Sequence, residues 1–378
     1  MICMKKFEII GILGTIRKSA AIKRAEAVKC AALVTVLAAA AFAADVQVVG
    51  AGNMTAYAAE STRTIGYDVT SRSMSNTASG TVTSGAVNAD EDVVHTEKYT
   101  PVSTEKTDAS TRFGGGSLTM LANNDSDSQN MSFIFDTGDG LIVVDGGWDV
   151  NGESLLKELK TRGGHVKAWL LTHAHRDHAM ALAYILSNHP NEITIDGIYY
   201  NFFDRDWYVN NDEESVMVYD ALMSSFGNIS ADKIHSDIKG GDVIEVGKAK
   251  VQVLNNPYKL KTNAGNSCSV CYMISMNGTN VVFLGDLTLA GGQYMMQDVD
   301  LASLKCDIVQ VAHHGQEGVG FDFYQTLRPK VMLWPTTEWL WNSGGTNGDA
   351  GIKATKAWQS GLLVKEYYVA KDGDVTLR

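Results

Sequence analysis

Three histidines and one aspartate stand close together in the segment Thr172-His173-Ala174-His175-Arg176-Asp177-His178. Neutral imidazole and carboxylate are the ligands that zinc and similar divalent ions accept. In extended backbone the side chains of His173 and His175 point to the same side, and a bend into a following helix brings Asp177 and His178 to the same cavity. Two adjacent pairs of this kind suit two metal ions about 3.5 to 4 Å apart. The alternative is a polar loop whose histidines only cap a helix, but this spacing rarely follows a hydrophobic strand by chance.

Apolar segments on both sides of this motif predict the elements that position it. Residues 166–171 form a hydrophobic run typical of a buried strand, and residues 179–186 follow as a helix. Upstream, the apolar run 141–144 ends in Asp145-Gly146-Gly147, which is a common way to hold a carboxylate at a sheet edge. Residues 152–162 carry leucines on one face and predict an amphipathic helix between the two strands.

Two later strands also end in polar groups. The run 280–284 ends in Gly285-Asp286, and the run 308–312 ends in His313-His314-Gly315. An aspartate at the end of an apolar run is costly to bury without a cation. These residues are therefore further ligand candidates. Either of the adjacent histidines could be the ligand. We favour His314, with His313 contacting the substrate or acting as a general acid.

Over residues 113–378 the sequence resembles the metallo-β-lactamase superfamily of metal-dependent hydrolases. The resemblance implies an α/β fold, a four-layer αββα sandwich, with two divalent ions: zinc first, with manganese or iron also compatible. It assigns His173 and His175 to one metal, Asp177 and His178 to the other, and Asp286 to both. Asp145 matches the aspartate that orients the site, and the histidine pair at 313–314 matches the last ligand motif.

The chain departs from most lactamases of this superfamily because it lacks a further histidine ligand before Asp286. Only His189 and His235 lie in that interval, and we interpret both as surface residues. The sequence instead has Asn266-Ser267-Cys268-Ser269-Val270, which resembles the branch with the ComEC hydrolase domain and the phosphorylcholine esterases. This branch implies phosphoric ester chemistry, with Asn266 and Ser269 lining the site. Gln316 stands where the branch often has serine.

The implied mechanism is the attack of a metal-activated water on phosphorus. Asp177 or Asp286 would orient the water, and His313 would protonate the leaving oxygen. The aromatic-rich segment 199–208 predicts substrate-lining roles for Tyr200, Asp204 and Trp207, because aromatic rings and acids can enclose a quaternary ammonium such as choline. Ordinary loop packing is an equal alternative.

The first part of the chain predicts export. A basic region, the uncharged apolar run 30–44 and Ala56-Tyr57-Ala58 follow the order of a secretory signal. The run is shorter than the roughly 20 residues of a membrane span. We expect residues 1–58 to be the signal region, 59–112 a Ser/Thr-rich and mostly disordered linker, and 113–378 the hydrolase domain. An uncleaved membrane anchor is the alternative. Residues 94–102 could form an edge strand.

The charge balance bears on the partners. The whole chain has a net charge of −11, and removal of residues 1–58, with seven cations and three anions, would make it −15. An acidic surface repels polyanions. We therefore expect a secreted or cell-surface hydrolase without a stable membrane span, acting on a small-molecule or cell-surface ester. An extracellular nuclease, a lactamase or lactonase, and a metal-free binding module are the alternatives. Cys268, Cys271 and Cys306 are expected to pack in the core.

Overall fold

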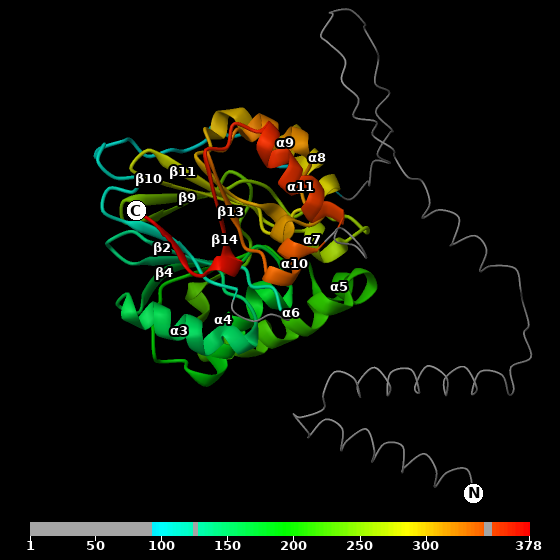
Figure 1. Ribbon diagram of the computed structural model, residues 1–378. Coiled ribbons are helices and arrows are strands. Elements are labelled where there is room, and N and C mark those ends of the chain that lie inside the picture. Colours follow the sequence, from blue (N-terminus) through cyan, green and yellow to red (C-terminus); the bar gives the residue numbers. More distant parts are fainter. Residues whose placement is uncertain (1–92, 124–127, 344–349) are drawn as a thin grey trace, which may run out of the picture. The chain divides into compact units, whose positions relative to one another are not determined.

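The computed structural model describes residues 93–123, 128–343 and 350–378 (Figure 1). The predicted signal region and the predicted linker as far as residue 92 lie outside the described residues. Within the described ranges, no helix is long and apolar enough to cross a membrane.

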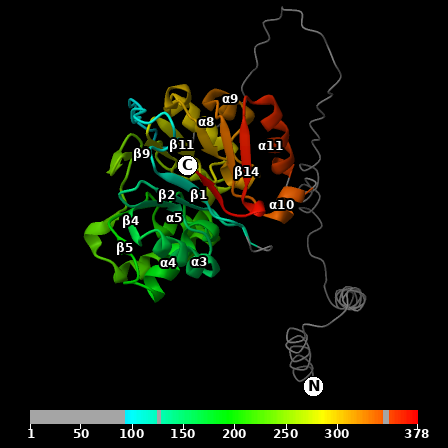
Figure 2. The ribbon, with the colours of Figure 1, turned by 60° about the vertical axis from the view of Figure 1, so that its left-hand side comes forward.

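Two β-sheets lie face to face, with helices on both outer sides (Figures 1 and 2). The predicted four-layer αββα class is therefore confirmed. The first sheet has the order β15 (Val375–Leu377), β1 (Ser117–Met120), β2 (Ser132–Asp136), β3 (Leu141–Asp145), β4 (His165–Leu170), β6 (Ile198–Tyr199) and β7 (Ile234–His235), with β5 (Thr194–Ile195) also on β4. The second has the order β14 (Glu366–Val369), β13 (Val331–Trp334), β12 (Ile308–Gln310), β11 (Thr279–Phe283), β10 (Tyr272–Met276), β9 (Ala249–Val253) and β8 (Val243–Val246).

Separate groups of helices cover the two sheets, as the turned view in Figure 2 shows. The helices of the first half are α3 (Gly152–Thr161), α4 (Arg176–Asn188), α5 (Arg205–Asn211) and α6 (Glu213–Ser225). Those of the second half are α7 (Ala264–Ser267), α8 (Leu289–Asp298), α9 (Phe321–Leu327), α10 (Glu338–Asn342) and α11 (Ala350–Gly361).

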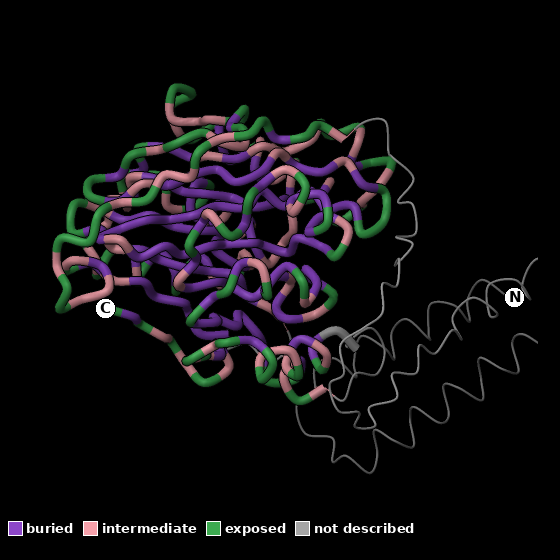
Figure 3. The backbone as a smooth tube through the Cα atoms, turned by 90° about the horizontal axis from the view of Figure 1, so that it is seen from above, coloured by how far each residue is buried: buried purple, intermediate pink, exposed green. Residues whose placement is uncertain are grey.

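Three apolar cores hold the four layers together, and Figure 3 shows the buried backbone in the middle of the molecule. Successive residues of a strand face opposite sides of its sheet. In β3, Val144 joins the core between the sheets, while Val143 joins the core under the helices of the first half. In β11, Val281 faces the first sheet and Val282 faces the helices of the second half. Both faces are buried, so the strands read as continuous apolar runs.

Both sheets change from antiparallel to parallel pairing part-way across. Strand β3 pairs antiparallel with β2 but parallel with β4. Likewise, β11 pairs antiparallel with β10 but parallel with β12, and β13 continues in parallel. Ligands of α/β sheets bind outside the carboxyl ends of parallel strands. The polar residues that follow β3, β4, β11 and β12 are therefore placed where a site is expected.

The described part of the predicted linker, residues 93–112, differs from the expectation because it is held against the second half. Thr104 N donates to Ser275 Oγ at 2.8 Å, and Thr107 N donates to Asn277 Oδ1 at 2.8 Å. The edge strand predicted at 94–102 does not form in this part of the chain. Val102 N instead donates to the Gln252 side chain at 2.9 Å. Side chains of the second sheet and of the turn after β10 thus bind backbone N–H groups of residues 93–112. The composition of this segment could not indicate these contacts.

Candidate metal centre

The histidine-rich segment spans the end of β4 and the start of α4. The helix begins at Arg176, three residues before the expected start, and His175 is its extended N-cap residue with φ −99° and ψ 158°. Asp177 and His178 therefore lie in the first helical turn. A carboxylate there is stabilised by the positive end of the helix dipole.

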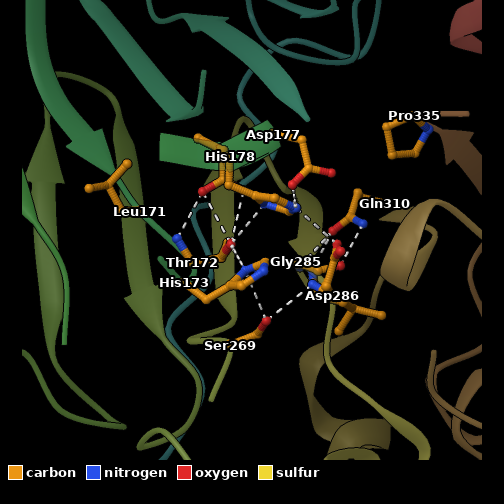
Figure 4. A network of polar contacts seen from close by, with 12 residues as sticks. Leu171, Thr172, His173, Asp177, His178, Ser269, Gly285, Asp286, Gln310 and Pro335 are labelled. Carbon is orange, nitrogen blue, oxygen red and sulfur yellow. Dashed lines mark hydrogen bonds and ion pairs between the residues drawn. The ribbon is translucent and has the colours of Figure 1, made fainter. Parts of the chain in front are cut away.

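Four side chains from both halves of the molecule meet at the carboxyl ends of the strands. Asp177, His178, Asp286 and His314 each offer a ligand atom, and these atoms all lie within 4.8 Å of one another. His314 Nε2 is 3.0 Å from Asp177 Oδ2 and 3.5 Å from Asp286 Oδ2, and His178 Nε2 is 3.2 Å from Asp286 Oδ1. Figure 4 shows Asp177, His178 and Asp286 close together. Oxygen and nitrogen ligands at this spacing can hold a divalent ion.

Buried ligand atoms without hydrogen bonds fit such an ion. These atoms are His173 Nε2, His178 Nε2, His314 Nε2 and Asp286 Oδ1. A buried polar atom is ordinarily hydrogen-bonded. The other ring nitrogen has a partner in each case: His178 Nδ1 lies 2.9 Å from Asp145 Oδ2, His314 Nδ1 lies 2.6 Å from Pro335 O, and His173 Nδ1 lies 3.3 Å from Ser269 Oγ. Metal-binding histidines are oriented by such contacts from the far nitrogen.

Asp145 positions the residues of the first half of the site through hydrogen bonds. Its φ of 57° lies in the left-handed region, which a non-glycine residue rarely adopts. Asp145 Oδ1 accepts from Thr172 N at 2.8 Å, and Asp145 Oδ2 accepts from Thr172 Oγ1 at 3.0 Å. Burial raises the pKa of Asp145, although His178 and Thr172 favour the carboxylate. The aspartate thus fixes both the backbone before the motif and the ring of His178.

Burial and charge set opposite protonation states within the cluster. Burial opposes a charge on His178, but Asp286, Asp177 and Asp145 outweigh it and raise the pKa of His178 well above its ordinary value. Burial, followed by the neighbouring His178 and His175, lowers the pKa of His173 well below the ordinary value. Because metal ligands must be deprotonated, an ion at this site would compete with the proton on His178.

The second half presents its ligands from strained loops. The φ angles of Gly285, His313 and His314 are 54°, 52° and 54°. Gln310, at the end of β12, holds the first of these loops: its Oε1 accepts from Leu284 N at 2.7 Å and Gly285 N at 2.8 Å, and its Nε2 donates to Gly285 O at 3.0 Å. Thr336 Oγ1 donates to His314 O at 2.6 Å.

The asparagine and serine found in place of a further histidine also lie at the site. Ser269 Oγ accepts from Asp286 N at 3.1 Å, so it holds the backbone of the aspartate. Asn266 Nδ2 is 3.2 Å from His313 Nε2, and that ring atom is 3.8 Å from Asp286 Oδ2. His313 remains partly accessible, with 17% of its side chain exposed, whereas His314 is fully buried.

A family model of the metallo-beta-lactamase superfamily matches residues 125–330. The chain belongs to this superfamily. No match was found among curated proteins. Among solved structures, the metallo-beta-lactamase fold protein YhfI from Bacillus subtilis is 12% identical, with 69% of this chain and 99% of that chain covered and a TM-score of 0.43. Unliganded yeast PDE1 is 13% identical, with 69% and 99% covered and a TM-score of 0.42. A diphosphatase of the PhnP family is 13% identical, with 58% and 85% covered and a TM-score of 0.35.

In this metallo-β-lactamase-fold protein, Asp212 is a site residue that the sequence did not reveal. It lies between α5 and α6 and accepts from His175 Nε2 at 2.9 Å. Ser215 Oγ donates to the same carboxylate oxygen. A side chain at Gly265 would collide with both Asp212 and His175, so this position requires glycine. With Nε2 engaged by Asp212, Nδ1 is the ring nitrogen of His175 that is left for a metal. No motif marks Asp212, because only the fold brings it to the histidine.

The predicted aromatic enclosure differs in the structure. Tyr200 is only 5% exposed and packs in the core under the helices, 4.7 Å between ring centroids from Phe202, so it does not line an open site. The cause is burial of its ring by Phe226 and its neighbours, which the aromatic composition alone cannot separate from exposure. Asp204 caps α5 by accepting from Trp207 N at 2.8 Å, and the Trp207 ring packs 4.5 Å from Phe203. Asp204 thus caps its own helix, and the partly buried Trp207 packs against the core under the helices of the first half.

The remaining predicted residues lie away from the four-ligand cluster. His189 pairs with Glu153 and Glu192 at the end of α4, and His235 stacks on Tyr199 with 4.4 Å between ring centroids. The cysteines are buried free thiols: Cys268, Cys271 and Cys306. Burial raises the pKa of Cys268 to about 12, so its thiol stays protonated. Core packing of the cysteines is confirmed.

Proposed function

We propose that this superfamily member is an exported hydrolase of phosphodiester or phosphorylcholine-type esters that uses two divalent ions, zinc first. The main supporting observation is that ligand atoms of Asp177, His178, Asp286 and His314 converge beside Asn266. Those of His178, Asp286 and His314 include buried atoms without a hydrogen-bond partner. Asn266 Nδ2 donates to Asn263 Oδ1 at 2.9 Å and lies 3.2 Å from His313 Nε2, so the amide positions the ring of His313 at the site. The presence of Asn266 and Ser269 where most lactamases have a further histidine supports phosphoric ester over β-lactam chemistry.

The chain supplies two sets of ligands. His173 and His175 would hold one ion, Asp177, His178 and His314 the other, and Asp286 both. When bound, such ions lower the pKa of a water molecule and neutralise negative charge that develops on the substrate. Asp145, Asp212 and the carbonyl of Pro335 hold the imidazole rings in place through their far nitrogens. This support lets the ligand set form before the metal arrives.

His313 is placed to act on the leaving group. Burial lowers its pKa, with Asp286 opposing that shift, so the ring is largely neutral at neutral pH. A neutral imidazole keeps one N–H. Because Asn266 Nδ2 can only donate to Nε2, this N–H stands on Nδ1. Donation from Nε2 to the oxygen of the breaking bond would require the Asn266 amide to turn its oxygen toward the ring. The carboxylates of Asp177 and Asp286 accept hydrogen bonds and can orient the attacking water. We therefore propose that at neutral pH His313 acts on the leaving oxygen as a neutral ring, through a hydrogen bond, and not as a protonated general acid.

Metal quantification combined with a substrate panel tests this proposal. The panel contains bis(4-nitrophenyl) phosphate, a phosphorylcholine ester, single-stranded DNA and a β-lactam. We expect turnover of a phosphoric ester by the metal-loaded protein, loss of turnover with a chelator, and recovery on addition of zinc. Hydrolysis of the lactam alone would overturn the choice of chemistry, and hydrolysis of DNA alone would favour the nuclease alternative. Full turnover without bound metal would overturn the metal-dependent mechanism.

Export rests on the order of basic, apolar and small residues in positions 1–58. Expression of the full chain in a bacterium with a secretion pathway, followed by N-terminal sequencing of the product, tests it. We expect a mature chain that begins near residue 59 in the medium or at the cell surface. A product that keeps Met1 and sediments with membranes would favour the uncleaved anchor.

A further inference from the structure

A cavity of about 560 Å³ lies in the second half of the molecule. It lies between the loop that follows β11, the loop that follows β12, and α11. Its lining residues come from four separate segments of the second half. Among them are Asn263, Thr288, Leu289, Gln316, Glu317 and Trp358.

The cavity is built on the same loops that carry the site residues. Asp286 is followed by Thr288 and Leu289, and the pair His313-His314 is followed by Gln316 and Glu317. Thr288 and Gly318 form an isolated β-bridge, which joins the two loops at the cavity.

A hydrogen-bonded chain of side chains links the cavity to the site. Asn263, on the cavity wall, accepts from Asn266 Nδ2 at 2.9 Å, and Asn266 Nδ2 is 3.2 Å from His313 Nε2. The cavity wall is thus two side-chain contacts away from His313.

The side chains of the cavity wall suit an uncharged, apolar ligand. Leu289 is 53% exposed at the start of α8, although a large apolar side chain gains free energy when it is covered. Ala290 and Trp358 complete the apolar part, and the Trp358 ring is braced by Phe321 with 6.1 Å between centroids. None of the lining residues is Lys or Arg, and the one charged side chain among them is the exposed Glu317. An anionic group would find no cation here and would be repelled by the carboxylate.

We propose that this cavity binds an uncharged apolar group of the ester, on the leaving-group side that faces His313. The inference rests on the proposed function. It moves the specificity-determining surface from segment 199–208 of the first half to Leu289 and Trp358 of the second half. The amides of Asn263, Gln293 and Gln316 stand at the same wall and can bind an ether or hydroxyl of the ligand.

Binding of simple phosphonates tests the proposal, because each probe carries a single substituent on phosphorus and is not hydrolysed. Dissociation constants of phenylphosphonate, 4-carboxyphenylphosphonate and methylphosphonate are measured by calorimetry on the zinc-loaded protein. We expect phenylphosphonate to bind about tenfold or more tightly than methylphosphonate. Leu289→Asp and Trp358→Ala should remove most of this preference and leave the methylphosphonate constant unchanged within about threefold. Leu363→Asp is the matched control, because Leu363 is 88% exposed and does not line the cavity.

The negative charge of Glu317 allows a second, independent test of the proposal. The wild type should bind 4-carboxyphenylphosphonate several-fold more weakly than phenylphosphonate, and Glu317→Gln should narrow that gap about twofold to threefold. Absence of a phenyl preference in the wild type would overturn the proposal. So would an equal loss of phenylphosphonate and methylphosphonate binding in Leu289→Asp, or a preference that survives in both apolar-wall variants. Hydrolysis of the ester panel by the same preparations tests the proposed function separately. If no ester is hydrolysed but phenylphosphonate is still preferred, the proposed function is refuted and the proposed role of the cavity is not.

Discussion

The two halves of the molecule supply the metal centre in opposite ways. The first half contributes His173, His175, Asp177 and His178 from one continuous junction between β4 and α4. The second half contributes Asp286 and His314 from two loops, and the backbone of His314 and of Gly285 is left-handed. Helix geometry presents the first set with little strain, whereas the second set depends on the contacts that hold its loops. The ligand residue with left-handed backbone is thus His314 of the second half, whereas in the first half that conformation falls on Asp145, which supports the ligands.

The cost of this arrangement falls on the supporting contacts of the second half. A non-glycine residue in the left-handed region costs of the order of 1 kcal/mol or more and persists only where its surroundings enforce it. Gln310 enforces the loop before Asp286, and Thr336 together with the carbonyl of Pro335 enforces the position of His314. Substitutions in the two halves should therefore differ in how much activity, metal affinity and stability they remove.

The largest effect is expected where the halves meet, at Asp286. Asp286→Asn keeps the shape of the side chain but removes the charge that both ligand sets need. We expect kcat to fall about 10³-fold or more, since metal sites contribute several kcal/mol of transition-state stabilisation. Bound metal, measured by elemental analysis, should fall with it. Asp206→Asn on the exposed face of α5 is the matched control and should behave as wild type. Wild-type turnover and metal content in Asp286→Asn would remove Asp286 from the site.

A smaller effect is expected in the first half, at Asp212. Asp212→Asn weakens the hydrogen bond that fixes the ring of His175 without touching the four-ligand cluster. Because supporting carboxylates are typically worth 10-fold to 100-fold in metal affinity, we expect a loss in that range for the more weakly bound zinc equivalent. Competition with a chromophoric chelator measures it. Asp212→Glu should not restore the affinity, because Gly265 leaves no room there. An unchanged zinc affinity in Asp212→Asn would show that the contact does not support a metal ligand.

One supporting side chain from each half can be replaced to compare how much each half depends on its supporting hydrogen bonds. Gln310→Leu leaves the N–H groups of Leu284 and Gly285 buried without acceptors, which should lower the free energy of unfolding by about 2 to 3 kcal/mol. Thr172→Val should cost less, about 1 kcal/mol, since Asp145 keeps Thr172 N and His178 as donors. Urea unfolding of the metal-free proteins measures both. Equal losses in the two variants would contradict the stronger dependence of the second half on its supporting contacts.

The same contrast explains how much the sequence could predict. The heptapeptide predicted its site because strand and helix geometry alone bring its side chains together, and the apolar runs predicted the strands of both sheets. Asp286 and His314 gained meaning only from their order after that motif. Asp212 and Gln310 could not be predicted, since each acts on a partner that only tertiary packing brings near. Tyr200 was misplaced because an aromatic residue after a strand has the same pattern whether it lines a site or fills a core.

The smallest predicted effect separates the two ends of α4. The start of the helix carries the metal candidates, whereas its end carries His189, whose Nδ1 lies 2.6 Å from Glu192 Oε1 and whose Nε2 lies 2.9 Å from Glu153 Oε1. Glu192 first and then Glu153 raise the pKa of His189, so the stabilisation is fully present below the unfolded pKa of about 6.5 and is lost as pH rises through the folded pKa. Tyr184 and then His189 lower the pKa of Glu153, and Lys160 and then His189 lower the pKa of Glu192, so the contributions of the two glutamates change only at more acidic pH.

The test is His189→Gln, with urea midpoints measured for both proteins at pH 6 and pH 9. The wild type should exceed the variant by a small margin at pH 6, and that margin should shrink at pH 9. Zinc should leave the margin unchanged, because His189 lies at the far end of α4 from the metal candidates. A margin that is independent of pH would mean that His189 stabilises the helix end through packing against Tyr184, whose ring centroid lies 5.7 Å away, and not through its charge.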